Sequence, residues 1–414
     1  MDEQDELGPL RDQFYLPPGL IYLDGNSLGV LPRATAGRVQ EVVSREWGRD
    51  LIQSWNKAGW FHQPQRVGDK IARLIGAARG EVMAADSTSL NLYKVLSVAC
   101  GFARADAPRR QAILSERDNF PTDLYIAESV ARQHGFELRL VEAEEITARL
   151  DGTVAVVVLT HVNYRSGHMH DMARMTAAAH AAGALMVWDL AHSAGAVEVD
   201  LMDCEADFAV GCGYKYLNGG PGAPAFLWLH PYHAARMDSE KLWQPLAGWM
   251  GHVVPFAFSP GYRPAAGALR FLCGTPSPIA LAALESGVDA LLEVEALGGM
   301  AALRAKSVAL TDLFIRLVEQ RCGGDGLRLL TPLDAARRGS QVSFRRHEGA
   351  YAIIQALIAR GVVGDFREPG LMRFGFAPLY LRFIDVWDAV DHLAQVMWRE
   401  EWRQPRFHRR TVVT

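Results

Sequence analysis

The sequence has little cysteine, no long apolar run and no strong excess of either charge. Its five cysteines are Cys100, Cys204, Cys212, Cys273 and Cys322. They are odd in number and widely scattered, and they form neither a CxxC pair nor a zinc spacing, so we interpret them as reduced thiols. The longest aliphatic run, Val154 to Leu159, is too short to cross a bilayer. His168 and His170 lie beside Asp171, but no second cluster completes a site, so we expect no metal.

The charge balance argues against a nucleic-acid-coating protein. The 414 residues carry a formal net charge of −4, with 49% hydrophobic and 22% charged residues, as in a globular enzyme. The arginines between 403 and 410 are explained by a solvated terminus. The amino terminus MDEQDELGPL is acidic and lacks an apolar segment, so we expect no secretory signal and a cytoplasmic location. Neither nucleic acid nor a membrane is an expected partner.

Strand-like and helix-like segments alternate through the first two thirds of the chain. Strands are predicted at 111–116, 137–142, 154–160 and 184–189, and helices at 122–135 and 171–183. This alternation indicates an α/β layer with a mostly parallel sheet, in which 154–159 should be central because both its faces are apolar. A long helical region is expected at 281–317, followed by a smaller α+β unit. We predict a large domain at 50–295 and a small domain formed by 1–49 with 296–414.

The segment FAVGCGYKYLNGGPG holds Lys215 between Tyr214 and a second tyrosine. A buried lysine loses proton affinity and can form a Schiff base, although a lysine snorkelling from a loop would look the same. Asp189 favours the Schiff-base interpretation of Lys215, because it directly follows the apolar run of the preceding predicted strand. Ligands of α/β proteins bind at the carboxyl ends of strands. An aspartate for the pyridine nitrogen and a lysine for the aldehyde carbon are what pyridoxal 5'-phosphate requires.

Other polar groups interrupt the predicted elements. Ser27 lies in a loop that could lend polar groups to a site. Thr88 and Ser89 begin a helix, where they either cap it or bind a phosphate. Arg373 interrupts an apolar strand and is either a buried ion-pair member or a grip on a substrate carboxylate. Trp55 belongs to an aromatic-rich stretch that either packs between layers or walls a pocket for an aromatic substrate.

Taken together, the motifs resemble kynureninase of the bacterial type. The resemblance extends over nearly the whole chain, in order, and is carried by LDGNSLG, STSLNL, NFPTDLY, WDLAHSAG, GYKYLNGGPG, GWMGH, CGTPSP and MRFGFAPLY. It implies a homodimer of the aspartate-aminotransferase-like fold (pyridoxal phosphate fold type I) with active sites at the subunit interface. It also implies hydrolytic cleavage of L-kynurenine, and of its 3-hydroxy form, to the corresponding anthranilate and L-alanine. That reaction belongs to tryptophan catabolism and NAD biosynthesis.

The resemblance also implies roles for individual residues. Lys215 would be the Schiff-base lysine, Asp189 would face the pyridine nitrogen, and Tyr214 would protonate the β-carbon or bind the phosphate. The remaining cofactor contacts would be Thr88, Ser89, Phe120, Asp123, Thr160, His192, Trp249 and the partner subunit's Thr275. Arg373 would hold the substrate carboxylate, with Ser27 and Trp55 bordering the aryl group. Met250 departs from the aromatic residue expected after Trp249, which bears on the choice of aryl group.

Two other functions compete with this one. Another enzyme of the same fold, such as a cysteine desulfurase or a class V aminotransferase, would share the lysine and the aspartate. A desulfurase, however, needs a reactive cysteine in a mobile loop, and no cysteine lies in an obvious one. A binding module with GGPG as a nucleotide cradle is disfavoured because the GxxxxGK[ST] pattern is absent.

Overall fold

The fold is described from a computed structural model, which describes residues 1–324 and 326–410. A seven-stranded sheet forms its centre, with the strand order β2-β8-β7-β6-β5-β3-β4. Its strands are β2 (Val82–Ala84), β3 (Ala112–Glu116), β4 (Glu137–Val141), β5 (Val154–Thr160), β6 (Leu185–Asp189), β7 (Phe208–Gly211) and β8 (Phe226–Leu229). The five strands from β7 to β4 are parallel, and β8 and β2 continue the sheet in antiparallel pairings.

Strand β5 is the centre of this sheet, as the sequence predicts. All seven of its residues are buried, and it pairs with β6 on one side and β3 on the other. A strand covered on both faces cannot alternate polar and apolar residues, which explains the sequence VAVVVLT. Its side chains divide between two core clusters, with Val157 and Leu159 in one and Val156 and Val158 in the other.

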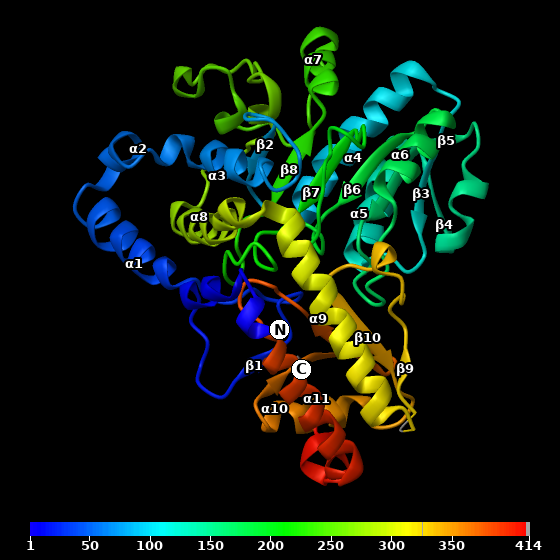
Figure 1. The fold of residues 1–414 in the computed structure, drawn as a ribbon. Helices are drawn as coiled ribbons and strands as arrows, with labels where there is room; N and C mark the ends of the chain where they lie inside the picture. Colours follow the sequence, from blue (N-terminus) through cyan, green and yellow to red (C-terminus); the bar gives the residue numbers. More distant parts are fainter. Residues whose placement is uncertain (325, 411–414) are drawn as a thin grey trace.

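Helices cover both faces of the sheet (Figure 1). Helices α4 (Thr88–Asp106), α5 (Pro121–His134) and α7 (Pro231–Glu240) contribute to the core on one face. Helices α3 (Gln63–Ala72), α6 (Met172–Ala181) and α8 (Pro278–Leu292) contribute to the core on the other. Helices α1 (Arg33–Glu41) and α2 (Ser54–Lys57) extend away from the sheet as an arm.

The long helical region expected at 281–317 is present and is divided between two helices. Helix α8 ends at Leu292, a 3₁₀ segment spans Glu293–Leu297, and α9 (Gly299–Cys322) begins a new direction. Gly298 has φ +96°, a left-handed conformation that ends the 3₁₀ segment at little cost for glycine. Helix α9 then runs from the large sheet to the smaller one (Figure 1).

A four-stranded antiparallel sheet lies below the large one in the view of Figure 1. Its order is β12-β13-β10-β9, and β1 and β11 form a short parallel pair. These strands are β1 (Ile21–Tyr22), β9 (Arg328–Leu329), β10 (Gln341–Arg345), β11 (Val362–Val363), β12 (Asp365–Arg367) and β13 (Leu371–Gly375). Helices α10 (Ala350–Ala359) and α11 (Phe383–Trp398) pack with them. The domain boundaries at 49/50 and 295/296 stay a prediction.

Candidate active site

A cavity of about 250 Å³ opens where the parallel strands β5 and β6 end. Its position is the one expected for a ligand site in an α/β sheet. Its walls are Ser87, Thr88, Ser89, Phe120, Thr122, Asp123, Thr160, Tyr164, Asp189, Ala191, His192, Tyr214 and Lys215. The structure therefore brings most of the sequence-predicted site residues to one place.

Two buried carboxyls form the acidic end of the cavity. Asp189 is the last residue of β6, and its strand partner Thr160 is the last residue of β5. The Thr160 hydroxyl lies 3.3 Å from Asp123 Oδ2 and 3.5 Å from Asp189 Oδ2, and the Ala191 N–H donates to Asp189 Oδ1 at 2.8 Å. Burial raises the pKa of both carboxyls, and the charge of Asp189 raises the pKa of Asp123 further. Of the two carboxyls, Asp123 is therefore the one whose protonated form is favoured more, because the Asp189 charge adds to the effect of burial.

The Lys215 amine lies at the other side of the same cavity. Its Nζ is 2.9 Å from His192 Nε2 and 5.7 Å from the centre of the Tyr214 ring. Burial, and then the charge of Lys215, keep the pKa of His192 well below its usual value, so its imidazole is neutral and accepts from the amine. Burial also raises the pKa of Tyr214, so its phenol retains its proton at neutral pH.

The amino end of helix α4 forms a third wall. Ser87 caps the helix by accepting the Leu90 N–H at 3.3 Å, and Thr88 and Ser89 are its first two residues. Unpaired N–H groups and the helix dipole make such an end suitable for a phosphate. Phe120 caps α5 at the rim of the cavity, with its ring edge-on to Tyr164 at 5.2 Å.

Arg373 lies just behind the cavity and is already paired. It is buried on β13 and donates to Asp365 through Nε at 2.7 Å and Nη2 at 2.5 Å. Its Nη2 also donates to Ser27 Oγ at 3.0 Å, and its Nη1 donates to the Tyr164 carbonyl at 2.5 Å. Asp365 holds one edge of the guanidinium, so the Nη1–Nη2 edge is the part that can exchange partners. Of the two alternatives left open by the sequence, the ion pair is present in the structure.

Trp55, Trp249 and Thr275 lie outside the cavity of their own chain. The rings of Trp55 and Trp249 meet edge-on at 6.4 Å, and Trp249 also contacts Phe256 at 5.6 Å. Met250 is buried in this region. Thr275 is exposed and lines a different cavity, of about 320 Å³, beside the start of α8.

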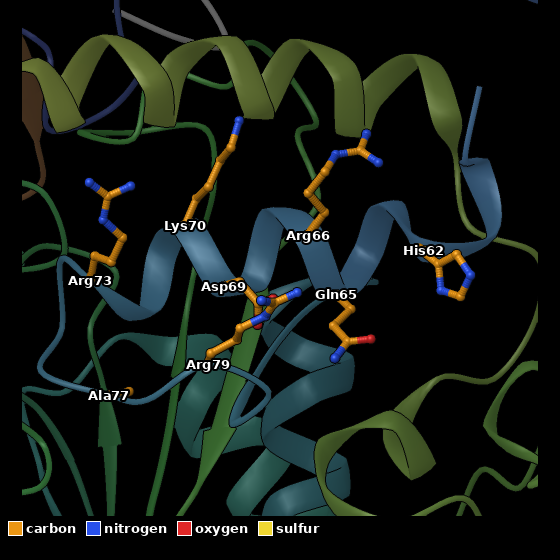
Figure 2. Close-up of a pocket in the computed structure, with 8 residues that line it drawn as sticks. All are labelled: His62, Gln65, Arg66, Asp69, Lys70, Arg73, Ala77 and Arg79. Atoms are coloured by element: carbon orange, nitrogen blue, oxygen red, sulfur yellow. The ribbon is translucent and has the colours of Figure 1, made fainter. Parts of the chain in front are cut away.

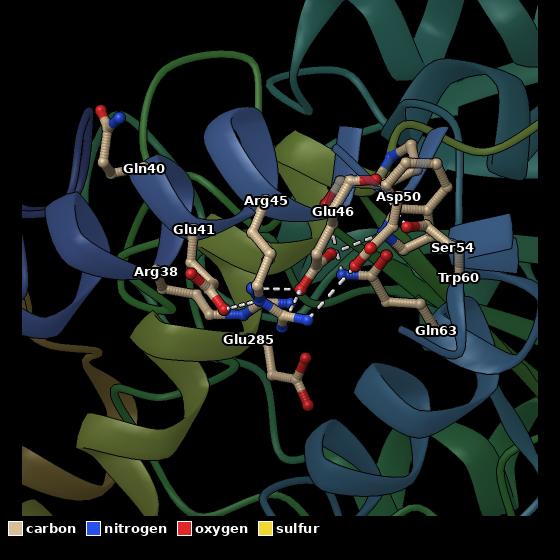
Figure 3. A network of polar contacts seen from close by, with 12 residues as sticks. Arg38, Gln40, Glu41, Arg45, Glu46, Asp50, Ser54, Trp60, Gln63 and Glu285 are labelled. Carbon is tan, nitrogen blue, oxygen red and sulfur yellow. Dashed lines mark hydrogen bonds and ion pairs between the residues drawn. The ribbon is translucent and has the colours of Figure 1, made fainter. Parts of the chain in front are cut away.

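A polar network around Glu46 holds Trp60, which in turn contacts Trp55 (Figure 3 shows the network). The buried carboxylate of Glu46 accepts the indole N–H of Trp60 at 2.7 Å and pairs with Arg38 at 2.7 Å. Trp60 packs edge-on against Trp55 at 6.1 Å. The buried carboxylate of Glu46 therefore fixes Trp60, and Trp60 in turn packs against the indole of Trp55.

A larger cavity, of about 560 Å³, is lined by basic side chains of α3 and the loop after it (Figure 2). Its cations are not available for an anionic ligand, because each is paired with an acid. Arg66 and Lys70 point toward α8 and bind Glu285, and Arg73 pairs with Glu295. Arg79 pairs with Asp69.

The two histidines considered as metal ligands lie ring to ring at 4.9 Å, and His170 Nε2 lies 2.9 Å from Glu116 Oε2. Within residues 1–324 and 326–410, no three His, Cys, Asp or Glu side chains gather as a metal-binding group. In the same ranges, no helix is long and apolar enough to span a bilayer.

Comparison with known proteins identifies the family. Residues 303–393 match the family model of the kynureninase C-terminal domain. A kynureninase of Burkholderia pseudomallei (strain 1106a) is 53% identical, and one of Pseudomonas fluorescens is 54% identical. Both matches cover 100% of this chain and 98% of the relative. The chain belongs to the kynureninase family. The predicted family and the prediction of an enzyme are thereby confirmed.

The comparison with solved structures confirms the fold class. A cysteine desulfurase from Thermococcus onnurineus NA1 superimposes with a TM-score of 0.76, covering 94% of this chain and 98% of the desulfurase. The two sequences are only 19% identical, so this likeness bears on the fold alone. The chain has the aspartate-aminotransferase-like α/β fold.

Sequence reasoning missed Tyr164 and Asp365. Tyr164 follows the end of β5, where a loop residue of a parallel strand is expected to reach a ligand, so its position alone could have indicated it. Asp365 is the direct cross-strand partner of Arg373. No sequence signal fixes that register, because β12 and β13 are both short.

Proposed function

We propose that this member of the kynureninase family uses pyridoxal 5'-phosphate to hydrolyse the Cβ–Cγ bond of L-kynurenine, giving anthranilate and L-alanine. The 3-hydroxy substrate would react in the same way. The observation that carries the proposal is that the Lys215 amine and the buried Asp189 carboxylate face the same cavity, in a chain 53% identical to kynureninases. The reaction would serve tryptophan breakdown or NAD biosynthesis, in the cytoplasm.

The residues of the cavity suit this cofactor. Asp189 presents a buried carboxylate for the pyridine nitrogen, and Asp123 and Thr160 surround it. The amine of Lys215 suits the aldehyde carbon. Across the cavity, the start of α4 with Thr88 and Ser89 suits the phosphate, while Phe120 and His192 flank the ring position.

The proton transfers can be assigned to side chains of this protein. When bound, the cofactor would hold the substrate through its amine nitrogen and would withdraw electrons from the α-carbon. Lys215 Nζ then takes the α-hydrogen as a proton. Neutral His192 accepts a hydrogen bond from this amine and carries no positive charge that would oppose the charge the amine gains. Water adds to the γ-carbonyl of the substrate, so that the acyl carbon leaves as the carboxylate of anthranilate. Tyr214 retains its phenolic proton and delivers it to the β-carbon as the Cβ–Cγ bond breaks. Asp189 stays ionised and holds the pyridine nitrogen protonated.

Arg373 binds the substrate carboxylate through its Nη1–Nη2 edge in this proposal. That edge now donates to the Ser27 hydroxyl and to the Tyr164 carbonyl, and the substrate carboxylate would take the place of these acceptors. The Nε edge stays with Asp365, so the guanidinium keeps its orientation.

The homodimer is part of the proposal. Thr275, Trp249 and Trp55 lie away from the cavity of their own chain, which suits residues that complete the site of a second copy. Exposed aromatic side chains near Trp249, among them Phe256 (60% exposed) and Phe258 (78%), support an interface there. A shared site would place Trp55 and Ser27 at the aryl group of the substrate.

The test is direct. The purified protein, supplied with pyridoxal phosphate and L-kynurenine, should form fluorescent anthranilate and equimolar L-alanine. Lys215→Ala should form neither and should hold no borohydride-reducible cofactor. Production of alanine from cysteine, or a keto acid from the amino donor, without anthranilate would favour a desulfurase or an aminotransferase and contradict the proposal.

A further inference from the structure

A second carboxyl, Asp24, stands beside the Arg373 ion pair. It follows β1 and forms an isolated parallel bridge with Gly375 at the end of β13, which carries Arg373. Its Oδ1 is buried and has no hydrogen-bond partner among the described residues. A buried carboxylate oxygen without a donor is costly, so the ionised form of Asp24 is poorly accommodated.

The charged and titratable groups that face Asp24 come from several elements. They are Asp365 and Arg367 on β12, Arg373 on β13, Tyr22 on β1, and Tyr216 and Tyr380 from the loops beside them. Burial raises the pKa of all three phenols, which therefore stay neutral. Burial, and next the charge of Asp365, raise the pKa of Asp24 to about 7, although a hydrogen bond with Ser27 and the charges of both arginines act in the opposite direction.

Asp365 itself stays ionised. Burial alone would raise its pKa, but the hydrogen bonds and charge of Arg373, together with the charge of Arg367 at 2.8 Å, keep it below the usual value. The pocket thus contains two fixed cations and one fixed carboxylate. With Asp24 neutral, one positive charge is left over for a bound carboxylate. With Asp24 ionised, the charges already cancel, and a further carboxylate would be an uncompensated buried charge.

We propose that Asp24 determines when the Arg373 pocket accepts a carboxylate: the substrate carboxylate binds only while Asp24 carries a proton. Binding to the ionised form therefore requires the uptake of one proton from solvent. The inference rests on the proposed function, because it takes Arg373 as the group that holds the substrate carboxylate. In this inference, Asp24 contributes to substrate specificity because it sets the charge of the pocket. It takes no part in the cleavage of the Cβ–Cγ bond.

The test compares the KM for L-kynurenine of the holoenzyme and its Asp24→Asn variant from pH 6 to pH 9. In the unmodified enzyme, linkage to one proton makes KM rise above about pH 7, toward about tenfold per pH unit. Asparagine stays neutral, so the KM of the variant should lack this rise. The KM of the unmodified enzyme divided by that of Asp24→Asn should therefore increase with pH by the same factor, while the ratio of the two kcat values stays constant with pH. Asp118→Asn is the matched control, since Asp118 also has a raised pKa but lies outside the pocket. It should leave the KM profile unchanged.

A second measurement needs no variant. Calorimetry of the holoenzyme at pH 8, in buffers of different ionisation enthalpy, should show that 3-benzoylpropionate binds with uptake of more protons than its amide, which lacks the carboxylate; neither ligand has an amine that titrates. Equal proton uptake by the two ligands overturns the inference even if Asp24→Asn does not fold. A KM ratio that is constant from pH 6 to 9 in an active enzyme overturns it as well, and leaves the proposed function intact. If the protein forms no anthranilate at any pH, the proposed function fails, and this inference fails with it.

Discussion

Removing Asp365 should destabilise the protein strongly, because it strands a buried guanidinium. Asp365 accepts hydrogen bonds from Arg373 Nε and Nη2 and from Ser27, at 2.7, 2.5 and 2.9 Å. Arg373 is only 2% exposed, so water cannot replace these contacts in Asp365→Ala. Breaking one side of such a buried pair costs about 3–5 kcal/mol, far more than the loss of a surface ion pair.

A double-mutant cycle separates the stranded charge from lost packing. Arg373→Met removes the charge and keeps an apolar side chain, so the double variant with Asp365→Ala should recover most of the loss, with a coupling energy above about 2 kcal/mol. The free energy of unfolding is measured by urea denaturation of the holoenzyme, followed by tryptophan fluorescence. Asp391→Ala, which removes a partly exposed pair with Arg321, is the control and should cost at most about 1 kcal/mol. A cost for Asp365→Ala no greater than that of the control would refute this account of the Arg373 pocket.

Three further results are expected. Asp189→Asn should still bind the cofactor, seen by its absorbance, but should form anthranilate about 10²- to 10³-fold more slowly, since the buried charge is lost; near-normal turnover would count against its role. Lys215→Ala and Thr275→Glu should each be inactive alone and recover about a quarter of normal activity as randomly mixed dimers, because one site in each mixed dimer is intact. No recovery would argue against a shared site. Burial raises the pKa of Asp207, but two histidines that hydrogen-bond to it lower the pKa to about 2. This stabilisation is present above the unfolded pKa of about 4 and is lost as the pH falls toward 2. Asp207→Asn should therefore cost about 2–3 kcal/mol at pH 6 and less at pH 3, measured by urea denaturation; an equal cost at both pH values would contradict the ion pair.

The features that could be predicted from the sequence are those fixed locally. The bounds predicted for β5 are the observed ones, because a strand buried on both faces must be apolar throughout. Asp189 and Lys215 could be placed at one edge of the sheet, since each directly follows or lies close to the end of a parallel strand. The turn between the 3₁₀ segment and α9 depends on the left-handed backbone at Gly298, which the apolar pattern of the region did not reveal.

The features that could not be predicted depend on contacts between distant segments. The sequence left two interpretations of Arg373 open, and only the antiparallel register of β12 and β13 sets Asp365 opposite it. The distance of Trp249 from the Lys215 cavity likewise depends on how a loop after the sheet folds back onto the arm that carries Trp55. Chain-wide resemblance supplied roles for these residues, but their local sequence carries no signal for their position.

The segment 23–29 links the two halves of the candidate site through its backbone. The N–H of Gly29 donates at 2.8 Å to the carbonyl of the residue before Lys215, and the N–H of Gly375, on the strand that carries Arg373, donates at 2.7 Å to the carbonyl of Leu23. A Cβ on Gly29 would lie 2.3 Å from the Lys215 carbonyl oxygen, so only glycine allows this approach. The spacing between the amine and the guanidinium is therefore set by backbone hydrogen bonds at both ends of one short loop. This explains why a segment that belongs to neither main sheet carries Ser27 and Asp24, the two side chains through which the carboxylate pocket can change its partners and its charge.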